Sequence, residues 1–159
     1  MTSLQALTLV HVLISLAVLF TGLPLLLGWK AGKTLPGLAT ATVVLLLLTS
    51  LSGFLFPFVK FLPSHAFGVL SLLLLAVTLY ARWSRQLAGG WRTAYGATLA
   101  MAIYLDAFVA LVQAFLKIPA LHALVPSDKS PGFAIGQGLL LVAFLALGTA
   151  AVRGLRRAG

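Results

Sequence analysis

The sequence predicts an all-α integral membrane protein, a single domain of five transmembrane helices with its N-terminus outside and its C-terminus in the cytoplasm. Hydrophobic residues make up 61% of the 159 residues, charged residues only 8%, and the mean hydropathy is +1.11. Soluble domains carry about 25% charged residues, so this chain lacks the polar surface that a soluble fold of its size needs. Five apolar runs are each long enough to cross a hydrocarbon core of about 30 Å.

The first predicted span covers residues 4–28, and it is too long for the apolar core of a signal peptide. Its polar residues are spaced three and four apart, so they share one helix face: Thr8, His11 and Ser15. Trp29, Lys30 and Lys33 follow the span. This aromatic and basic end is expected in the headgroup zone of the membrane.

The second span is predicted over residues 38–61 and the third over residues 66–82. The second changes from a plain apolar run to a polar stretch at residues 49–53, and Pro57 is expected to kink or end its helix. The link at residues 62–65 is so short that the two spans are expected to form an antiparallel hairpin.

The fourth span is predicted over residues 94–117 and the fifth over residues 132–152. The loop between them contains an apolar stretch at residues 120–125, expected to lie along the membrane interface as a short helix. Glycines near or in the fifth span are expected to permit close helix packing: Gly132, Gly136 and Gly148.

The distribution of basic residues sets the predicted orientation. Eight fall on the side that holds the C-terminus: Lys30, Lys33, Arg82, Arg85, Arg92, Arg153, Arg156 and Arg157. The other side holds Lys60, Lys117 and Lys129. Because cytoplasmic loops carry the excess of Lys and Arg, the N-terminus is predicted outside.

Several classes of function find no support in the composition. The chain has no cysteine, which excludes disulfides, thiolate nucleophiles, iron–sulfur clusters and Cys-based zinc sites. The net charge of +9 is scattered at span ends and forms no continuous stripe, so we expect no nucleic-acid partner. No phosphate-binding loop, nucleophile elbow or metalloprotease motif is present, and the sequence favours a non-enzymatic protein.

Asp106 stands in the middle of the fourth span, where an ionisable side chain costs about 2.5 to 3.5 kcal/mol on insertion scales. At about 1.5 Å per residue, His11 lies roughly 10 Å and Asp106 roughly 16 Å below the outer face. Other polar residues of the outer half are Ser52, His65, Gln113 and Gln137. The sequence therefore predicts an outward-opening polar pocket above a dry inner half, although each side chain also has a plain packing or capping interpretation.

Four segments together resemble a group of small bacterial multi-pass inner-membrane proteins of unassigned function: residues 11–15, 49–57, 63–65 and 104–119. The resemblance covers most of the chain and implies a location in the inner membrane but no activity. In that group Asn often stands where this chain has Asp106, which implies that ionisation there is not essential to the group.

Three functional hypotheses follow. The first is a pocket lined by His11, Asp106, Gln113, Gln137 and Ser52 that binds a small ligand or moves a proton or solute, with His11 and Asp106 as the coupling pair. The second is an accessory or scaffolding subunit of a larger membrane complex, against which a monodisperse homo-oligomer would speak. As partners, the sequence leaves open a homo-oligomer or a larger membrane complex. The third is a haem b or quinone redox protein that uses His11 and His65.

Overall fold

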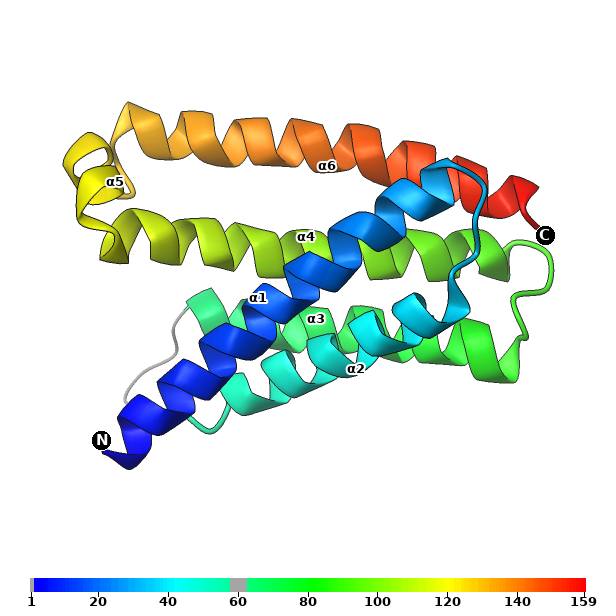
Figure 1. Ribbon diagram of the computed structural model, residues 1–159, viewed down its shortest axis with the longest axis horizontal. Helices are drawn as coiled ribbons and strands as arrows, with labels where there is room; N and C mark the ends of the chain where they lie inside the picture. Colours follow the sequence, from blue (N-terminus) through cyan, green and yellow to red (C-terminus); the bar gives the residue numbers. More distant parts are fainter. Residues whose placement is uncertain (1, 58–62) are drawn as a thin grey trace.

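The computed structural model describes residues 2–57 and 63–159 (Figure 1). Within these residues, five helices are long and apolar enough to cross a membrane, as predicted. They are α1 (Ser3–Lys30), α2 (Pro36–Gly53), α3 (Pro63–Leu79) with a π-helical turn η1 (Tyr80–Ser84), α4 (Trp91–Lys117) and α6 (Pro131–Arg157). The short helix α5 (Pro119–Leu124) lies between α4 and α6 and confirms the helix expected at residues 120–125.

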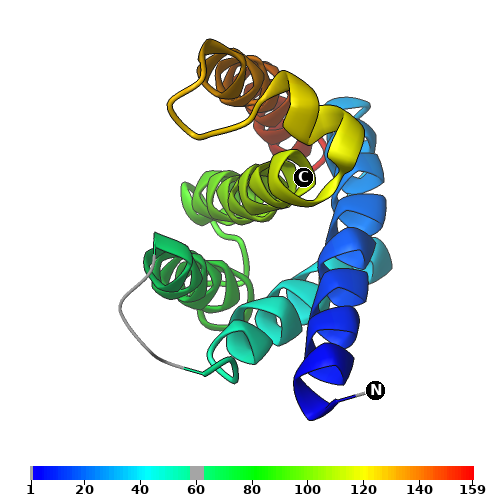
Figure 2. The same cartoon turned by 90° about the vertical axis from the view of Figure 1, so that its left-hand side faces the viewer.

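Helix α4 is the centre of the bundle and packs against α1, α2, α3 and α6. Seen from one end, α6, α4 and α3 form a row, and α1 runs along one side of that row (Figure 2). Helix α1 crosses α4 at an angle, and the two chain termini lie at opposite ends of the bundle (Figure 1).

The second span is shorter than predicted, because α2 ends at Gly53. Its 18 residues measure about 27 Å, close to the thickness of a hydrocarbon core. Pro57 has no backbone N–H and disfavours helical geometry in the residue before it, so the chain leaves the helix before this proline. The rest of the predicted span beyond residue 57, which includes Lys60, lies outside the described residues, as does Leu62 of the predicted hairpin link.

Other helices extend past their predicted limits. Helix α3 begins at Pro63, a residue whose fixed φ and missing N–H suit the first turn of a helix. Helix α4 begins at Trp91, and α6 continues to Arg157 instead of ending at residue 152. The last turns of α6 contain three arginines, which are good helix formers, and no proline.

The apolar core lies in the half of the bundle that contains the C-terminus, where the sequence predicts a dry interior. Its largest fully buried side chains include Leu25, Trp29, Tyr95, Leu99 and Ile103. Trp29, which was expected in the headgroup zone, is fully buried inside the bundle. Its ring packs 5.6 Å from the ring of Tyr95, and its indole N–H donates to the carbonyl oxygen of Thr34 at 2.9 Å.

Glycines allow the closest helix contacts. A Cβ atom on Gly154 of α6 would overlap the main-chain carbonyl oxygen of Trp29 at the end of α1. Gly136 faces Phe115 of α4 closely, in agreement with its predicted packing role. A Cβ atom on Gly148 would make only an ordinary contact with Ala100, and Gly132 faces Val125 of the preceding loop.

Candidate functional site

A polar pocket of about 100 Å³ lies between α1, α2, α3 and α4, and we call it the central pocket. Six of its lining side chains are polar or ionisable: His11, Ser15, Thr49, Ser50, Ser71 and Asp106. It occupies the half of the bundle away from the apolar core, around the N-terminal part of α1. The predicted concentration of polar groups in one half of the protein is therefore present in the structure.

Asp106 supplies the carboxyl group of the central pocket. It is 9% exposed, and the hydroxyl of Ser15 on α1 donates to its Oδ1 atom at 3.0 Å. Its other oxygen, Oδ2, is buried and has no hydrogen-bond partner among the described residues. A buried polar atom without a partner costs about 1 to 3 kcal/mol, so Oδ2 is favourably placed to gain a hydrogen-bond partner.

His11 lines the central pocket, but the two residues that hold its ring in place, Ser52 and Phe56, do not. Its Nδ1 atom lies 2.8 Å from Oγ of Ser52, and its ring meets the ring of Phe56 edge-on at 5.4 Å between centroids. The Ser52 hydroxyl donates to the carbonyl oxygen of Thr49 at 3.1 Å. Because a hydroxyl has one proton, Ser52 accepts from an Nδ1–H of His11 while it donates to Thr49.

Hydroxyl groups complete the wall on α2 and α3. The hydroxyl of Ser50 donates to that of Ser71 at 3.2 Å and so joins the two helices. Thr49 Oγ1 is buried and, within residues 2–57 and 63–159, it has no hydrogen-bond partner. The central pocket thus combines one open acceptor, on Asp106, with one open hydroxyl, on Thr49.

His11 and Asp106 line the same pocket, but no hydrogen bond or ion pair in the described chain joins them directly. Each is bonded to a serine instead, His11 to Ser52 and Asp106 to Ser15. Ser15 lies one helical turn after His11 on α1, so one face of that helix presents both groups to the pocket. The two residues of the predicted pair thus line one pocket, and each is hydrogen-bonded to a different serine.

Gln113 and Gln137 do not line the central pocket, and this part of the prediction is wrong. Gln113 shares a helix face with Asp106 but lies seven residues, about 10 Å, further along α4, where its side chain is exposed. Gln137 of α6 is buried against α4, where its Nε2 donates to the carbonyl oxygen of Phe108 at 3.3 Å. Helical spacing correctly placed Gln113 on the same face of α4 as Asp106, but it did not show that Gln113 lies beyond the level of the pocket formed with the neighbouring helices.

The second predicted pair, His11 and His65, lies around the C-terminal end of α2. The ring of His65 is tilted against that of Phe54 at 6.4 Å, whereas His11 contacts Ser52 and Phe56. In the described parts of the chain, no group of three or more His, Cys, Asp or Glu side chains is placed to hold a metal ion. The haem and quinone hypotheses stay predictions.

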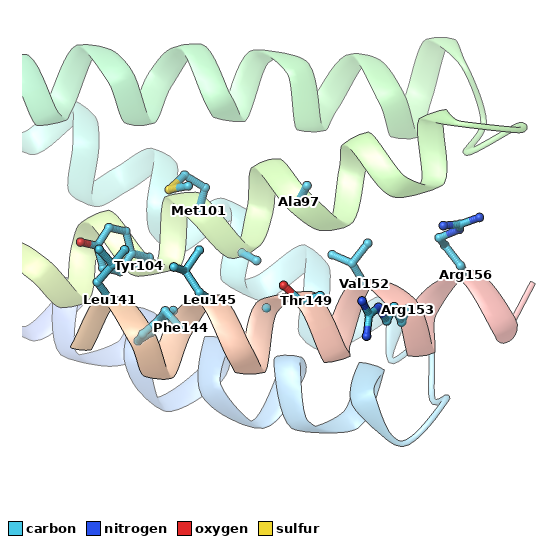
Figure 3. A pocket seen from close by; sticks show the side chains of 12 residues that line it. Ala97, Met101, Tyr104, Leu141, Phe144, Leu145, Thr149, Val152, Arg153 and Arg156 are labelled. Atoms are coloured by element: carbon cyan, nitrogen blue, oxygen red, sulfur yellow. The ribbon is translucent and has the colours of Figure 1, made fainter. Parts of the chain in front are cut away.

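A larger hollow, of about 360 Å³, lies between α4 and α6 (Figure 3). It is mainly apolar and contains neither His11 nor Asp106. The hollow with the larger volume is therefore not the one that contains the ionisable residues. We assign the candidate site by its chemistry, because the central pocket holds the buried carboxyl group.

Comparison with protein-family models, with curated proteins and with solved structures found no match for this chain.

Proposed function

We propose that this multi-pass membrane protein binds a proton at Asp106 in the central pocket and moves protons across the membrane. The observation that carries the proposal is the half-paired carboxyl group, with Oδ1 bonded to Ser15 and Oδ2 open, on the wall of a polar pocket. Ionisable residues inside membrane spans commonly mark ion pathways and proton relays. No covalent chemistry is needed for this role.

The size of the pocket favours a proton over a larger solute. A volume of about 100 Å³ has room for about three water molecules at roughly 30 Å³ each. Sites for drug-sized ligands and cofactors measure about 300 to 1,000 Å³. A proton, together with a few waters, fits the central pocket, whereas a typical metabolite does not.

The side chains around Asp106 are suited to proton exchange. Hydroxyl groups both donate and accept hydrogen bonds, and an imidazole changes its charge near neutral pH. Ser15 links α1 to the carboxyl group, and Ser52 links α2 to His11. These contacts support a short relay in which His11 and Asp106 exchange protons across the pocket.

The orientation that fits the charge distribution places the central pocket toward the outside. Eight of the eleven Lys and Arg residues belong to the end that holds the C-terminus, and the positive-inside rule makes that end cytoplasmic. The pocket lies in the opposite half, so protons would enter it from the outer side.

The test is proton flux into liposomes that contain the purified protein, an imposed pH gradient and a trapped pH-sensitive dye. We expect the wild-type protein to collapse the gradient faster than empty liposomes, and Asp106→Asn and Asp106→Leu to abolish the excess rate. Asp128→Asn is the matched control, because Asp128 is the other side-chain carboxylate and lies exposed in a loop. A wild-type rate equal to that of empty liposomes, or full flux in a monodisperse Asp106→Leu variant, would refute the proposal.

A further inference from the structure

The hollow between α4 and α6 has the form of an apolar groove with a basic end, and we call it the α4–α6 groove. All twelve residues that line it come from these two helices. Figure 3 shows Tyr104 and Leu141 at one end, Thr149 and Val152 along its length, and Arg156 at the other end. We propose that this groove binds one acyl chain of an anionic phospholipid, with the phosphate held by Arg153 and Arg156.

Small residues give the groove its depth. Ala97 and Ala100 on α4 and Gly148 on α6 stand where larger apolar side chains would fill the space between the two helices. A Cβ atom on Gly148 would meet only the Cβ of Ala100, at an ordinary 3.6 Å. The glycine is therefore not required by a tight backbone contact, and its absent side chain contributes open volume to the groove.

The length of the apolar part matches one leaflet of a membrane. Leu141 to Val152 covers eleven helical steps, which is about 16 Å at 1.5 Å per residue. Half of a hydrocarbon core is about 15 Å. An acyl chain in the groove would therefore reach the middle of the bilayer while its headgroup stays level with Arg153 and Arg156.

Within residues 2–57 and 63–159, no Asp or Glu side chain lies at the basic end of the groove. The two side-chain carboxylates of the chain are Asp106, in the middle of α4, and Asp128, in the loop beyond its far end. Arg82 and Arg85 lie over aromatic rings, at 5.9 Å from Tyr95 and 5.4 Å from Trp91. In the described chain, neither Arg153 nor Arg156 makes an ion pair or a cation–π contact, so both guanidinium groups are available for a phosphate.

Arg156 also connects the groove to a polar hollow. This second hollow, of about 340 Å³, is lined by Arg92 and by the turn at residues 86–89. An apolar channel that opens beside two arginines and a polar hollow is complementary to an amphiphile with an anionic head and a polar headgroup. Basic pockets between transmembrane helices on the cytoplasmic side are known to suit anionic lipid headgroups.

The experiment is native mass spectrometry of the purified full chain in detergent, after addition of phosphatidylglycerol or phosphatidylcholine in equal amounts. We expect one phosphatidylglycerol to remain bound preferentially. The variant R153Q/R156Q should lose about thirtyfold in affinity, since each arginine near an anionic lipid contributes about fivefold. The control K33Q/R157Q removes the same charge from the same end of the bundle and should bind as the wild type does.

A second pair of variants tests the apolar part. Ala97→Leu places a larger side chain in the groove and should weaken retention of the lipid, whereas Ala146→Leu alters an exposed position of α6 outside the groove and should not. Equal retention of both lipids, unchanged retention by R153Q/R156Q, or equal effects of the two leucine variants would overturn the proposal. A dimer that Ala97→Leu dissociates would assign the groove to a second copy of the chain and would also overturn it.

Discussion

Ser15 of α1 donates a hydrogen bond to Asp106 of α4 across 3.0 Å, and this bond links two helices that are separated by 91 residues in the sequence. Asp106 has no other hydrogen-bond partner in the part of the chain that the structure describes. The bond therefore has two consequences. It fixes the carboxyl group against α1, and it leaves Oδ2 as the carboxyl oxygen without a hydrogen-bond partner among the described residues.

Substitution of Ser15 by Ala should destabilise the protein by about 1 to 3 kcal/mol, because the carboxyl group then loses its partner and stays buried. The measurement is thermal unfolding in detergent. Thr8→Ala is the matched control on the same helix, since the Thr8 hydroxyl is exposed and bonds only to the carbonyl oxygen of Leu4. Equal thermal unfolding midpoints for Ser15→Ala and Thr8→Ala would show that the hydrogen bond to Asp106 does not stabilise the protein.

The contact between His11 and Ser52 should appear as a coupling free energy in a double-mutant cycle. For His11→Leu and Ser52→Ala we expect a coupling of about 0.6 kcal/mol, the average for hydrogen bonds between membrane helices. The control cycle combines His11→Leu with Ser71→Ala, because both residues line the central pocket but no hydrogen bond joins them. Similar coupling in the two cycles would contradict the bond seen in the structure.

The sequence was sufficient for the number of spans, because hydropathy reports directly on which segments can enter a bilayer. It also placed His11 and Asp106 on the wall of one pocket, because both lie in the same half of the bundle on helices that pack together, but the two are not bonded to each other in the described chain. The sequence could not identify Ser15 as the hydrogen-bond partner of Asp106, or Ser71 as the partner of Ser50. A hydroxyl in an apolar helix can bond to its own backbone, as Thr21 and Thr42 do, or across to another helix, and the sequence does not distinguish these cases.

The burial of Trp29 is a second feature that could not be predicted from the sequence. An aromatic residue beside two lysines is typical of the membrane interface. Trp29 is nevertheless fully buried, with its ring against Tyr95 of α4. The close approach of α6 to α1 depends on Gly154, whose hydrogen atom leaves room for the backbone of Trp29. Burial of this kind is a property of the packed helices and has no local signal in the sequence.

Substitution of Gly154 by Ala should therefore destabilise the bundle, since the added Cβ atom would overlap the carbonyl oxygen of Trp29 and a backbone cannot move aside easily. Overpacking of this kind costs about 1 to 3 kcal/mol. Gly138→Ala is the matched control on α6, because a Cβ atom there meets nothing within 4 Å and Ala favours a helix by up to about 1 kcal/mol. Thermal unfolding in detergent compares the two, and a Gly154→Ala variant as stable as Gly138→Ala would contradict the close contact between α1 and α6.

The proposed orientation can be tested by single cysteines, because the chain has none of its own. Ser127→Cys lies in the loop between α5 and α6, and Lys33→Cys lies in the turn between α1 and α2, at opposite ends of the bundle. Both positions are exposed, so accessibility to a thiol reagent depends on the side of the membrane. In intact cells, a membrane-impermeant maleimide should label Ser127→Cys and not Lys33→Cys, while both should react after lysis. Labelling of Lys33→Cys alone would reverse the orientation, place the central pocket toward the cytoplasm, and require protons to enter the relay from that side.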